Sequence, residues 1–239
     1  MTRAHPDEAL RPIRIETSFL ERRPGSVLYS SGDTRVLCTA SLETGVPPFL
    51  EGKGRGWSTA EYSLLPGSTT PRNPRERSKL SGRTQEIQRL IGRSLRGVLD
   101  LGALDGYTLV VDCDVLQADG GTRTASINGA YVAAALAVRA ALAEGRLSRS
   151  PLRTAVGAVS VGIVGGRLLV DLDYAEDARA DVDLNLVLTE QREILEIQGT
   201  AEGRPFPRED LDRLVDLGSR AIKEIIATCQ RALEGGAVP

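Results

Sequence analysis

Residues 109–126, LVVDCDVLQADGGTRTAS, join an apolar, valine-rich segment to an alanine-rich one through a pair of glycines. This order predicts a strand that passes through a glycine turn into a helix. The first N–H groups of a helix have no partner within it and attract anions, and Arg123 adds a permanent positive charge. The segment therefore predicts a phosphate site, although the spacing is not that of a nucleoside-triphosphate P-loop. The alternative is an ordinary left-handed turn in which Thr124 or Ser126 caps the helix and Arg123 is solvated.

On both sides of this segment the chain shows strands followed by a helix. We expect helices at 83–99, 126–143 and 208–233, and strands at 13–19, 26–30, 34–41, 58–65, 107–116, 155–164, 167–173, 183–189 and 194–198. The order of several strands followed by a helix occurs twice along the chain. This repeat predicts an α/β fold of the α+β type in which two pseudo-duplicated halves share one core. No linker separates the halves, so residues 1–239 are expected to form a single domain, with its ordered core at about 11–233.

The composition excludes several classes of protein. A chain of 239 residues with 41% hydrophobic content can bury a sizeable core. We expect no apolar run to reach the roughly 20 residues of a membrane span, and residues 1–20 lack a signal-peptide core, so we expect a cytoplasmic protein without a membrane partner. Three widely spaced cysteines, Cys38, Cys113 and Cys229, are expected to be buried thiols.

The chain contains one histidine, His5, in a polar N-terminal tail where no order is expected. A Ser-His-Asp triad, a Cys-His pair, a two-histidine ribonuclease site and a histidine-ligated zinc are therefore excluded. Chemistry must come from carboxylates, arginines, lysines, hydroxyls and the backbone.

Charge is separated along the chain although the net charge is only −2. Residues 72–96 carry eight basic side chains against two acidic ones, and residues 171–183 carry six acidic side chains against one arginine. This separation predicts an anion track and a cation site in one molecule. On the helix at 83–99, Arg89, Arg93 and Arg96 lie opposite the apolar face, where they can meet solvent, RNA or another subunit.

Two helix starts and one acidic segment are the candidates for chemistry. Arg83 begins one helix, and Arg123 follows the glycine turn of the other, which together suit a dianion such as inorganic phosphate. Asp177 and Asp183, with Asp181 between them, suit a hard cation such as Mg²⁺, which binds one or two carboxylates together with waters and substrate phosphate. The alternative for this acidic segment is simple solvation.

Several ordered motifs resemble the bacterial ribonuclease PH family. They are LCTAS at 37–41, GWSTAEY at 56–62, GRTQEIQRLI at 82–91, DCDVLQADGGTRTAS at 112–126 and EIQGTAEG at 196–203. The resemblance covers residues 11–233. It implies a phosphate-dependent 3′-to-5′ exoribonuclease that trims transfer RNA precursors, releases nucleoside diphosphates and can run in reverse as a nucleotidyltransferase.

The resemblance also implies roles for individual residues. The phosphate-binding positions match Arg83, Gly121, Thr122 and Arg123, with inorganic phosphate as co-substrate. The carboxylates that hold Mg²⁺ or Mn²⁺ and supply the general acid match Asp177 and Asp183. Family members form a hexameric ring, a trimer of dimers, in which arginines of the loop matching 66–82 guide RNA. The arginines available for this are Arg72, Arg75 and Arg77, with Arg89 on the following helix, whereas Gly67 stands where some relatives are expected to carry arginine.

Two other functions fit parts of the sequence. A metal held by the acidic segment could activate water, which would make the protein a hydrolase that releases nucleoside monophosphates. A non-catalytic ring subunit or RNA-binding scaffold would be expected to lose the phosphate-binding or acidic residues, and this chain retains Arg83, Arg123, Asp177 and Asp183.

Overall fold

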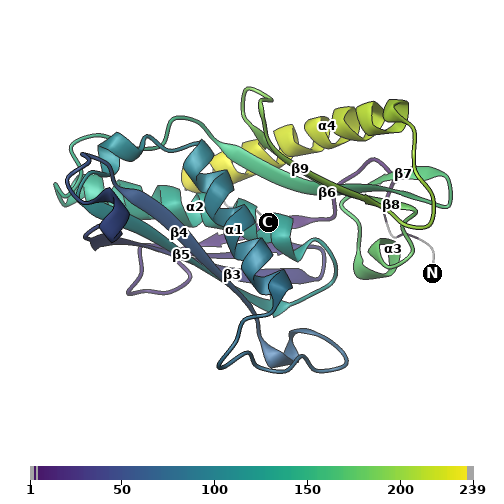
Figure 1. Cartoon of the computed structure of the whole chain (residues 1–239), viewed down its shortest axis with the longest axis horizontal. Coiled ribbons are helices and arrows are strands. Elements are labelled where there is room, and N and C mark those ends of the chain that lie inside the picture. The colour runs from purple at the N-terminus through teal and green to yellow at the C-terminus, as the bar shows by residue number, and fades with distance from the viewer. Residues whose placement is uncertain (1–2, 4, 236–239) are drawn as a thin grey trace.

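The computed structural model describes residue 3 and residues 5–235, which form two β-sheets with helices between and outside them (Figure 1). The five-stranded sheet has the order β1-β2-β3-β5-β4, and its neighbours are antiparallel except for the parallel pair β4 and β5. Its strands are β1 (Ile13–Thr17), β2 (Gly25–Ser31), β3 (Thr34–Thr44), β4 (Trp57–Leu64) and β5 (Tyr107–Gln117). The four-stranded antiparallel sheet has the order β7-β6-β8-β9, with β6 (Val156–Val164), β7 (Arg167–Val170), β8 (Val182–Thr189) and β9 (Ile194–Ala201).

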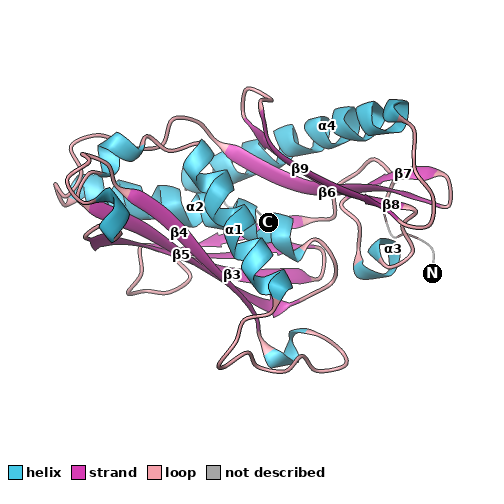
Figure 2. Cartoon of the chain, in the orientation of Figure 1, coloured by secondary structure: helices cyan, strands magenta, loops and turns pink. Residues whose placement is uncertain are grey.

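Helix α2 (Thr122–Ala143) lies between the two sheets and contacts β2, β3 and β5 on one side and β6 on the other (Figure 2). Helix α1 (Gly82–Gly97) packs on β4, and α4 (Arg208–Leu233) packs on β6 and β8. Apolar residues of both sheets and of α1, α2 and α4 belong to one continuous core. The predicted α/β class and the repeated order of strands followed by a helix are confirmed.

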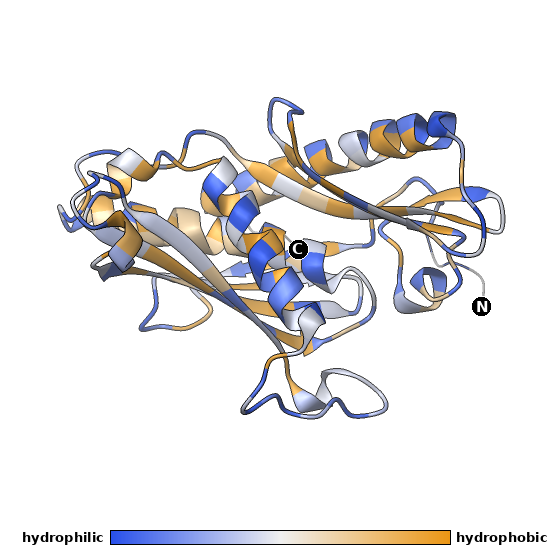
Figure 3. Ribbon diagram, in the orientation of Figure 1, coloured by the Kyte–Doolittle hydropathy of each residue, from blue (hydrophilic) through white to orange (hydrophobic). Residues whose placement is uncertain are grey.

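The hydropathy of each helix matches its position. α1 and α4 have one apolar and one polar face, and α2 is apolar or small on nearly every side (Figure 3). By length and composition alone α2 could cross a membrane, yet 78% of its most apolar window is buried inside the protein. The expectation that no apolar run reaches this length was wrong; two sheets cover the helix, so it needs no polar face.

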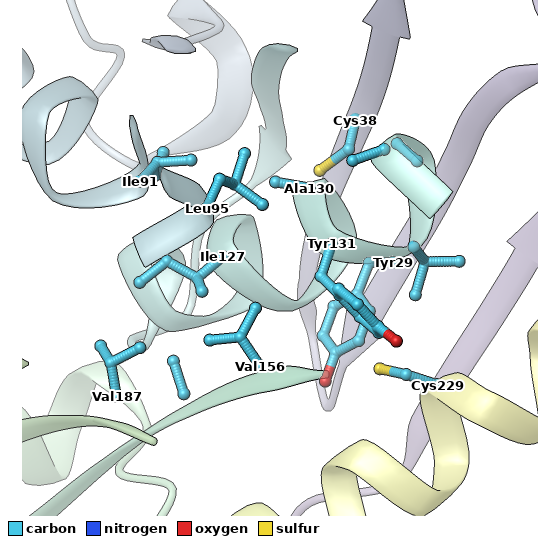
Figure 4. Packing of buried hydrophobic residues seen from close by; sticks show 14 of the residues in the cluster. Tyr29, Cys38, Ile91, Leu95, Ile127, Ala130, Tyr131, Val156, Val187 and Cys229 are labelled. Carbon is cyan, nitrogen blue, oxygen red and sulfur yellow. The ribbon is translucent and has the colours of Figure 1, made fainter. Parts of the chain in front are cut away.

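Small residues let α2 approach the sheets closely (Figure 4). A Cβ on Gly129 would lie 2.6 Å from the Sγ of Cys38. Asn128 is buried and joins the halves, because its Nδ2 donates to the Ala158 carbonyl at 2.9 Å and its Oδ1 accepts from the Ala158 N–H at 2.8 Å. The predicted free, buried thiols are confirmed for all three cysteines.

The predicted start of α2 and end of β7 were wrong, and the alternative cap for α2 is not formed. α2 begins at Thr122 rather than 126, because Gly121 already turns the chain with a left-handed φ of 62°. Neither Thr124 nor Ser126 caps the helix, since both hydroxyls donate to carbonyls of the preceding turn. β7 ends at Val170 rather than 173, because Asp171 has a left-handed φ of 53°.

The N-terminal tail and the acidic segment are more ordered than the sequence predicts. A short helix, α3 (Tyr174–Asp177), was not expected in the acidic segment. Described residues of the tail pack beside it: the Asp7 carbonyl accepts from the Val170 N–H at 2.9 Å, and Arg3 pairs with Glu176 at 2.6 Å. The expected disorder around His5 was therefore wrong, because a buried ion pair and a backbone hydrogen bond hold this part of the tail.

Candidate active site

A cavity of about 310 Å³ lies where β8, α3 and the first turns of α1 and α2 meet. It brings together all six residues for which phosphate binding or catalysis was predicted, although they are spread over 100 positions of the chain. Its lining residues are Leu64, Thr69, Arg83, Ala118, Gly120, Gly121, Thr122, Arg123, Ser160, Tyr174, Asp177, Asp183 and Asn185. A larger cavity of about 530 Å³ runs along α4, and none of the predicted site residues lines it.

The glycine turn before α2 is held from several sides. Gly120 and Gly121 have φ values of 70° and 62°, which glycine adopts without strain. A Cβ on Gly120 would lie 2.6 Å from the Leu172 carbonyl oxygen, so the turn touches the backbone just before α3. The Thr34 hydroxyl donates to the Gly120 carbonyl at 2.6 Å and accepts from the Asp119 N–H at 2.9 Å. The first N–H groups of α2 are thereby fixed toward the cavity.

A buried ion pair also contacts the glycine turn. Arg11 and Asp171 are 2.7 Å apart, and each side chain is only 6% exposed. The second carboxylate oxygen of Asp171 accepts from the Arg11 N–H and from the Ser31 hydroxyl, and Arg11 also donates to the Asp119 carbonyl at 2.5 Å. Both charged groups are therefore hydrogen-bonded, which lowers the cost of burying the pair, although the buried Nε of Arg11 has no partner among the described residues.

The acidic segment divides into structural and cavity-facing carboxylates. Asp171 belongs to the buried pair. Asp173 caps α3 by accepting from the Glu176 N–H at 2.8 Å, and Glu176 completes a capping box while pairing with Arg3. Asp181 accepts from the Gly165 N–H at 3.0 Å. Of the six acids in this segment, Asp177 and Asp183 are the two that line the cavity.

The two predicted phosphate-binding arginines each lie near a helix N-terminus. Arg83 is the second residue of α1, which Ser81 caps by accepting from the Thr84 N–H at 3.1 Å. Arg123 is the second residue of α2, and its side chain is 19% exposed. Both guanidinium groups therefore add to the positive end of a helix dipole.

Arg123 is oriented by two residues that the sequence patterns did not indicate. Its Nη2 lies 3.7 Å from the Glu86 carboxylate on α1, and its Nη1 donates to the Gln198 side chain on β9 at 3.5 Å. Gln198 in turn donates to Glu86 at 2.9 Å. Both lie inside motifs that resemble ribonuclease PH, yet only the tertiary fold brings α1 and β9 to the same arginine.

Asp183 has the chemistry of a cation ligand. Its Oδ1 is buried and has no hydrogen-bond partner among the described residues. Burial, followed by the charge of Asp177, raises the pKa of Asp183 to about 6, and Arg123 and Arg83 partly offset this rise. An orphaned carboxylate oxygen beside a second carboxylate fits Mg²⁺ or Mn²⁺. Within residues 3 and 5–235 no cluster of three potential metal-ligating side chains occurs, so substrate or water oxygens would have to complete the coordination.

The predicted RNA-binding arginines lie outside the cavity. Arg72, Arg75 and Arg77 lie in the segment between β4 and α1, and Arg89 lies on α1. Gly67 is exposed in the same segment. Arg96, on the same polar face of α1 as Arg89, contacts the protein instead. Its guanidinium lies 4.5 Å from the centre of the Trp57 ring and donates to the Ser58 carbonyl, so its role is in packing.

Some cavity residues were missed because their signal is tertiary. Ser160 and Asn185 occupy paired positions on β6 and β8 and carry no motif of their own. Tyr174 begins α3, which the sequence did not predict. Tyr62 does not line the cavity, yet its hydroxyl lies 2.9 Å from the Thr122 hydroxyl and supports the start of α2.

Comparisons with known proteins agree with this architecture. The 3′ exoribonuclease family profile matches in two parts, its domain 1 at residues 9–140 and its domain 2 at residues 154–221. Ribonuclease PH of Syntrophomonas wolfei is 54% identical over 223 residues, which cover 92% of this chain and 93% of that protein. The chain belongs to the ribonuclease PH family.

Solved structures with low sequence identity share the ribonuclease PH fold. Rice (Oryza sativa) Rrp46 gives a TM-score of 0.78 at 19% identity, over 96% of this chain and 98% of that one. An Archaeoglobus fulgidus exosome with RNA bound to its active site gives 0.75 at 22% identity, over 92% and 89%. The fold predicted from the resemblance to ribonuclease PH is therefore confirmed.

Proposed function

We propose that this protein is a phosphate-dependent 3′-to-5′ exoribonuclease that releases nucleoside diphosphates and can run in reverse as a nucleotidyltransferase. The observation that carries the proposal is the single cavity in which two arginines and a glycine turn face two carboxylates. Membership of the ribonuclease PH family supports it.

The residues of the cavity divide the reaction between them. Arg83, Arg123 and the backbone N–H groups of Gly121 and Thr122 hold inorganic phosphate, as helix N-termini and arginines hold dianions. A phosphate oxygen attacks the phosphorus of the last phosphodiester, and the bond from that phosphorus to the 3′-oxygen of the shortened RNA breaks. Phosphate is already an anionic nucleophile at neutral pH, so this step needs positioning and charge neutralisation rather than a histidine base.

The carboxylates act on the other side of the attacked phosphorus. Asp177 and Asp183 would hold Mg²⁺ or Mn²⁺, which would supply positive charge to offset charge on the scissile group. The departing 3′-oxygen takes up a proton, and we assign one of the same two carboxyl groups, Asp177 or Asp183, as its donor. The nucleoside diphosphate leaves with the former inorganic phosphate as its terminal group.

The proposal extends to the substrate and to assembly. We assign the 3′ ends of transfer RNA precursors as substrates, guided by Arg72, Arg75, Arg77 and Arg89, whose positions outside the cavity suit contacts to an RNA backbone. We also propose a hexameric ring built as a trimer of dimers. The structural relatives that are exosome assemblies support a ring, and the resemblance to ribonuclease PH supports this stoichiometry.

Product analysis with and without phosphate tests the proposed reaction. A short RNA incubated with Mg²⁺ is expected to yield nucleoside diphosphates only when phosphate is present. Arg123→Ala is expected to raise the KM for phosphate about 10- to 150-fold, the effect of losing charged hydrogen bonds. Arg208→Ala, which removes an arginine that is 86% exposed at the start of α4, is the matched control and should leave this KM unchanged.

Two outcomes would contradict the proposal. Nucleoside monophosphates released in phosphate-free buffer would favour hydrolysis. Trimming that survives both Arg123→Ala and Asp183→Ala unchanged would show that the chemistry lies elsewhere.

A further inference from the structure

An exposed tyrosine lies at the wall of the active-site cavity. Tyr174 is 67% exposed, the largest exposed fraction among the large apolar side chains of the described residues. It lines the same cavity as the phosphate-binding turn and the two carboxylates. A single exposed apolar side chain needs no explanation, but this ring lies beside the place where RNA must end.

Several hydrogen bonds and an ion pair hold the backbone that carries this ring. Tyr174 is the first residue of α3, after Asp173 and before Glu176, which form a capping box. The Nη1 of Arg3 forms an ion pair with the Oε2 of Glu176 at 2.6 Å. The Tyr174 N–H also donates to the Asp119 carboxylate at 3.4 Å, which ties the start of α3 to the phosphate-binding turn.

The ring and the chemistry share one side of α3. Tyr174 and Asp177 are three residues apart, a spacing that puts side chains on the same helix face. Tyr174 is also the aromatic residue among the described residues that line the cavity. The ring therefore lines the cavity in which the last phosphodiester of an RNA would meet the bound phosphate.

We infer that the Tyr174 ring is a stacking platform for a base at the 3′ end of the RNA, within one nucleotide of the attacked phosphodiester. The inference rests on the proposed function. Aromatic stacking accepts every base, because each base has a π-face. A stacked base would hold the last phosphodiester in line with the bound phosphate without reading the sequence. Tyr174 is thus a substrate-positioning residue.

The main test is RNA binding without phosphate, so that no turnover occurs. Tyr174→Ala is expected to weaken binding of a short single-stranded RNA about 5- to 150-fold, the range for losing one base stack. Tyr174→Phe and Tyr174→Trp keep a ring and should bind like the parent protein. The control is Phe49→Ala, which removes a ring that is 56% exposed and packs on Trp57 outside the cavity.

RNAs that lack one base separate stacking from a structural role. If Tyr174 stacks on the terminal or penultimate base, an abasic nucleotide at that position should abolish the difference between the parent and Tyr174→Ala. The KM for phosphate should stay within about twofold in the same variant, because the phosphate-binding groups are assigned to other residues, Arg83, Gly121, Thr122 and Arg123.

Three results would overturn the inference. They are unchanged RNA binding in Tyr174→Ala, an equal loss in Tyr174→Phe, and an effect that persists on both abasic RNAs. A parent protein that binds RNA through Tyr174 but releases no nucleoside diphosphates with phosphate would overturn the proposed function and leave the stacking assignment standing.

Discussion

Replacing Gly120 with alanine tests whether the phosphate-binding turn depends on its contact with the segment before α3. The added Cβ would lie 2.6 Å from the Leu172 carbonyl oxygen and 2.7 Å from the Tyr174 backbone nitrogen. Both are backbone atoms, so the turn or α3 must move. The chain offers a matched control in Gly145, which also has a φ of 70° but where an added Cβ would meet nothing within 4 Å.

The two substitutions share one energetic term and differ in another. A left-handed conformation costs an alanine about 1–2 kcal/mol, which both variants lose. Gly120→Ala adds overpacking, typically about 1–3 kcal/mol, so we expect a total of about 2–5 kcal/mol against about 1–2 kcal/mol for Gly145→Ala. The difference isolates the contact between the turn and the backbone before α3.

Urea unfolding of both variants measures the two totals, and steady-state kinetics measures the KM for phosphate. We expect this KM to rise at least tenfold in Gly120→Ala and to stay unchanged in Gly145→Ala, because only the first moves N–H groups that hold phosphate. Equal stability losses together with an unchanged KM in Gly120→Ala would show that the phosphate-binding turn does not depend on this contact.

Three further predictions concern charges. Because the pKa of Asp183 is raised to about 6, its carboxylate takes up a proton as the pH falls through 6. The Mn²⁺ concentration that half-saturates the site should therefore rise about tenfold per pH unit below 6. Mn²⁺ binding measured by electron paramagnetic resonance that does not change between pH 7 and 5 would contradict this. Arg11→Ala leaves Asp171 charged and buried, so urea unfolding should show that the free energy of unfolding falls by about 3–5 kcal/mol. The double variant Arg11→Ala/Asp171→Ala should lose less stability than the two single variants lose together. Losses that are strictly additive would rule out coupling between the two side chains. Arg96→Ala should lose about 0.5–1 kcal/mol of stability from its contact with Trp57 while RNA affinity stays constant; weakened RNA binding would instead place Arg96 on the RNA path.

The sequence predicted the elements well where a local pattern determines them. Alternating strands and the amphipathic helices α1 and α4 were found, and α4 has the bounds expected, Arg208–Leu233. The start of α2 was misplaced by four residues, because a helix that two sheets cover has no amphipathic period to mark its first turn. The early end of β7 depends on the buried pair of Asp171 with Arg11, a contact across 160 positions that no local pattern predicts.

The candidate site shows the same division. Local sequence patterns predict where the helices start and which charged residues are candidates. Four of these residues meet in one cavity as expected: Arg83, Arg123, Asp177 and Asp183. Whether an acidic side chain faces that cavity or is used in the fold cannot be read locally. Glu176 and Asp177 are adjacent in sequence, yet the first is buried against Arg3 and the second lines the cavity.

In the proposed reaction, inorganic phosphate held by Arg83, Gly121, Thr122 and Arg123 is the reagent that attacks RNA. Mass spectrometry of the products from a reaction with ¹⁸O-labelled phosphate tests it most directly. We expect nucleoside diphosphates whose terminal phosphate carries the label. Unlabelled nucleoside monophosphates that take up oxygen from ¹⁸O-labelled water in a parallel reaction would contradict it.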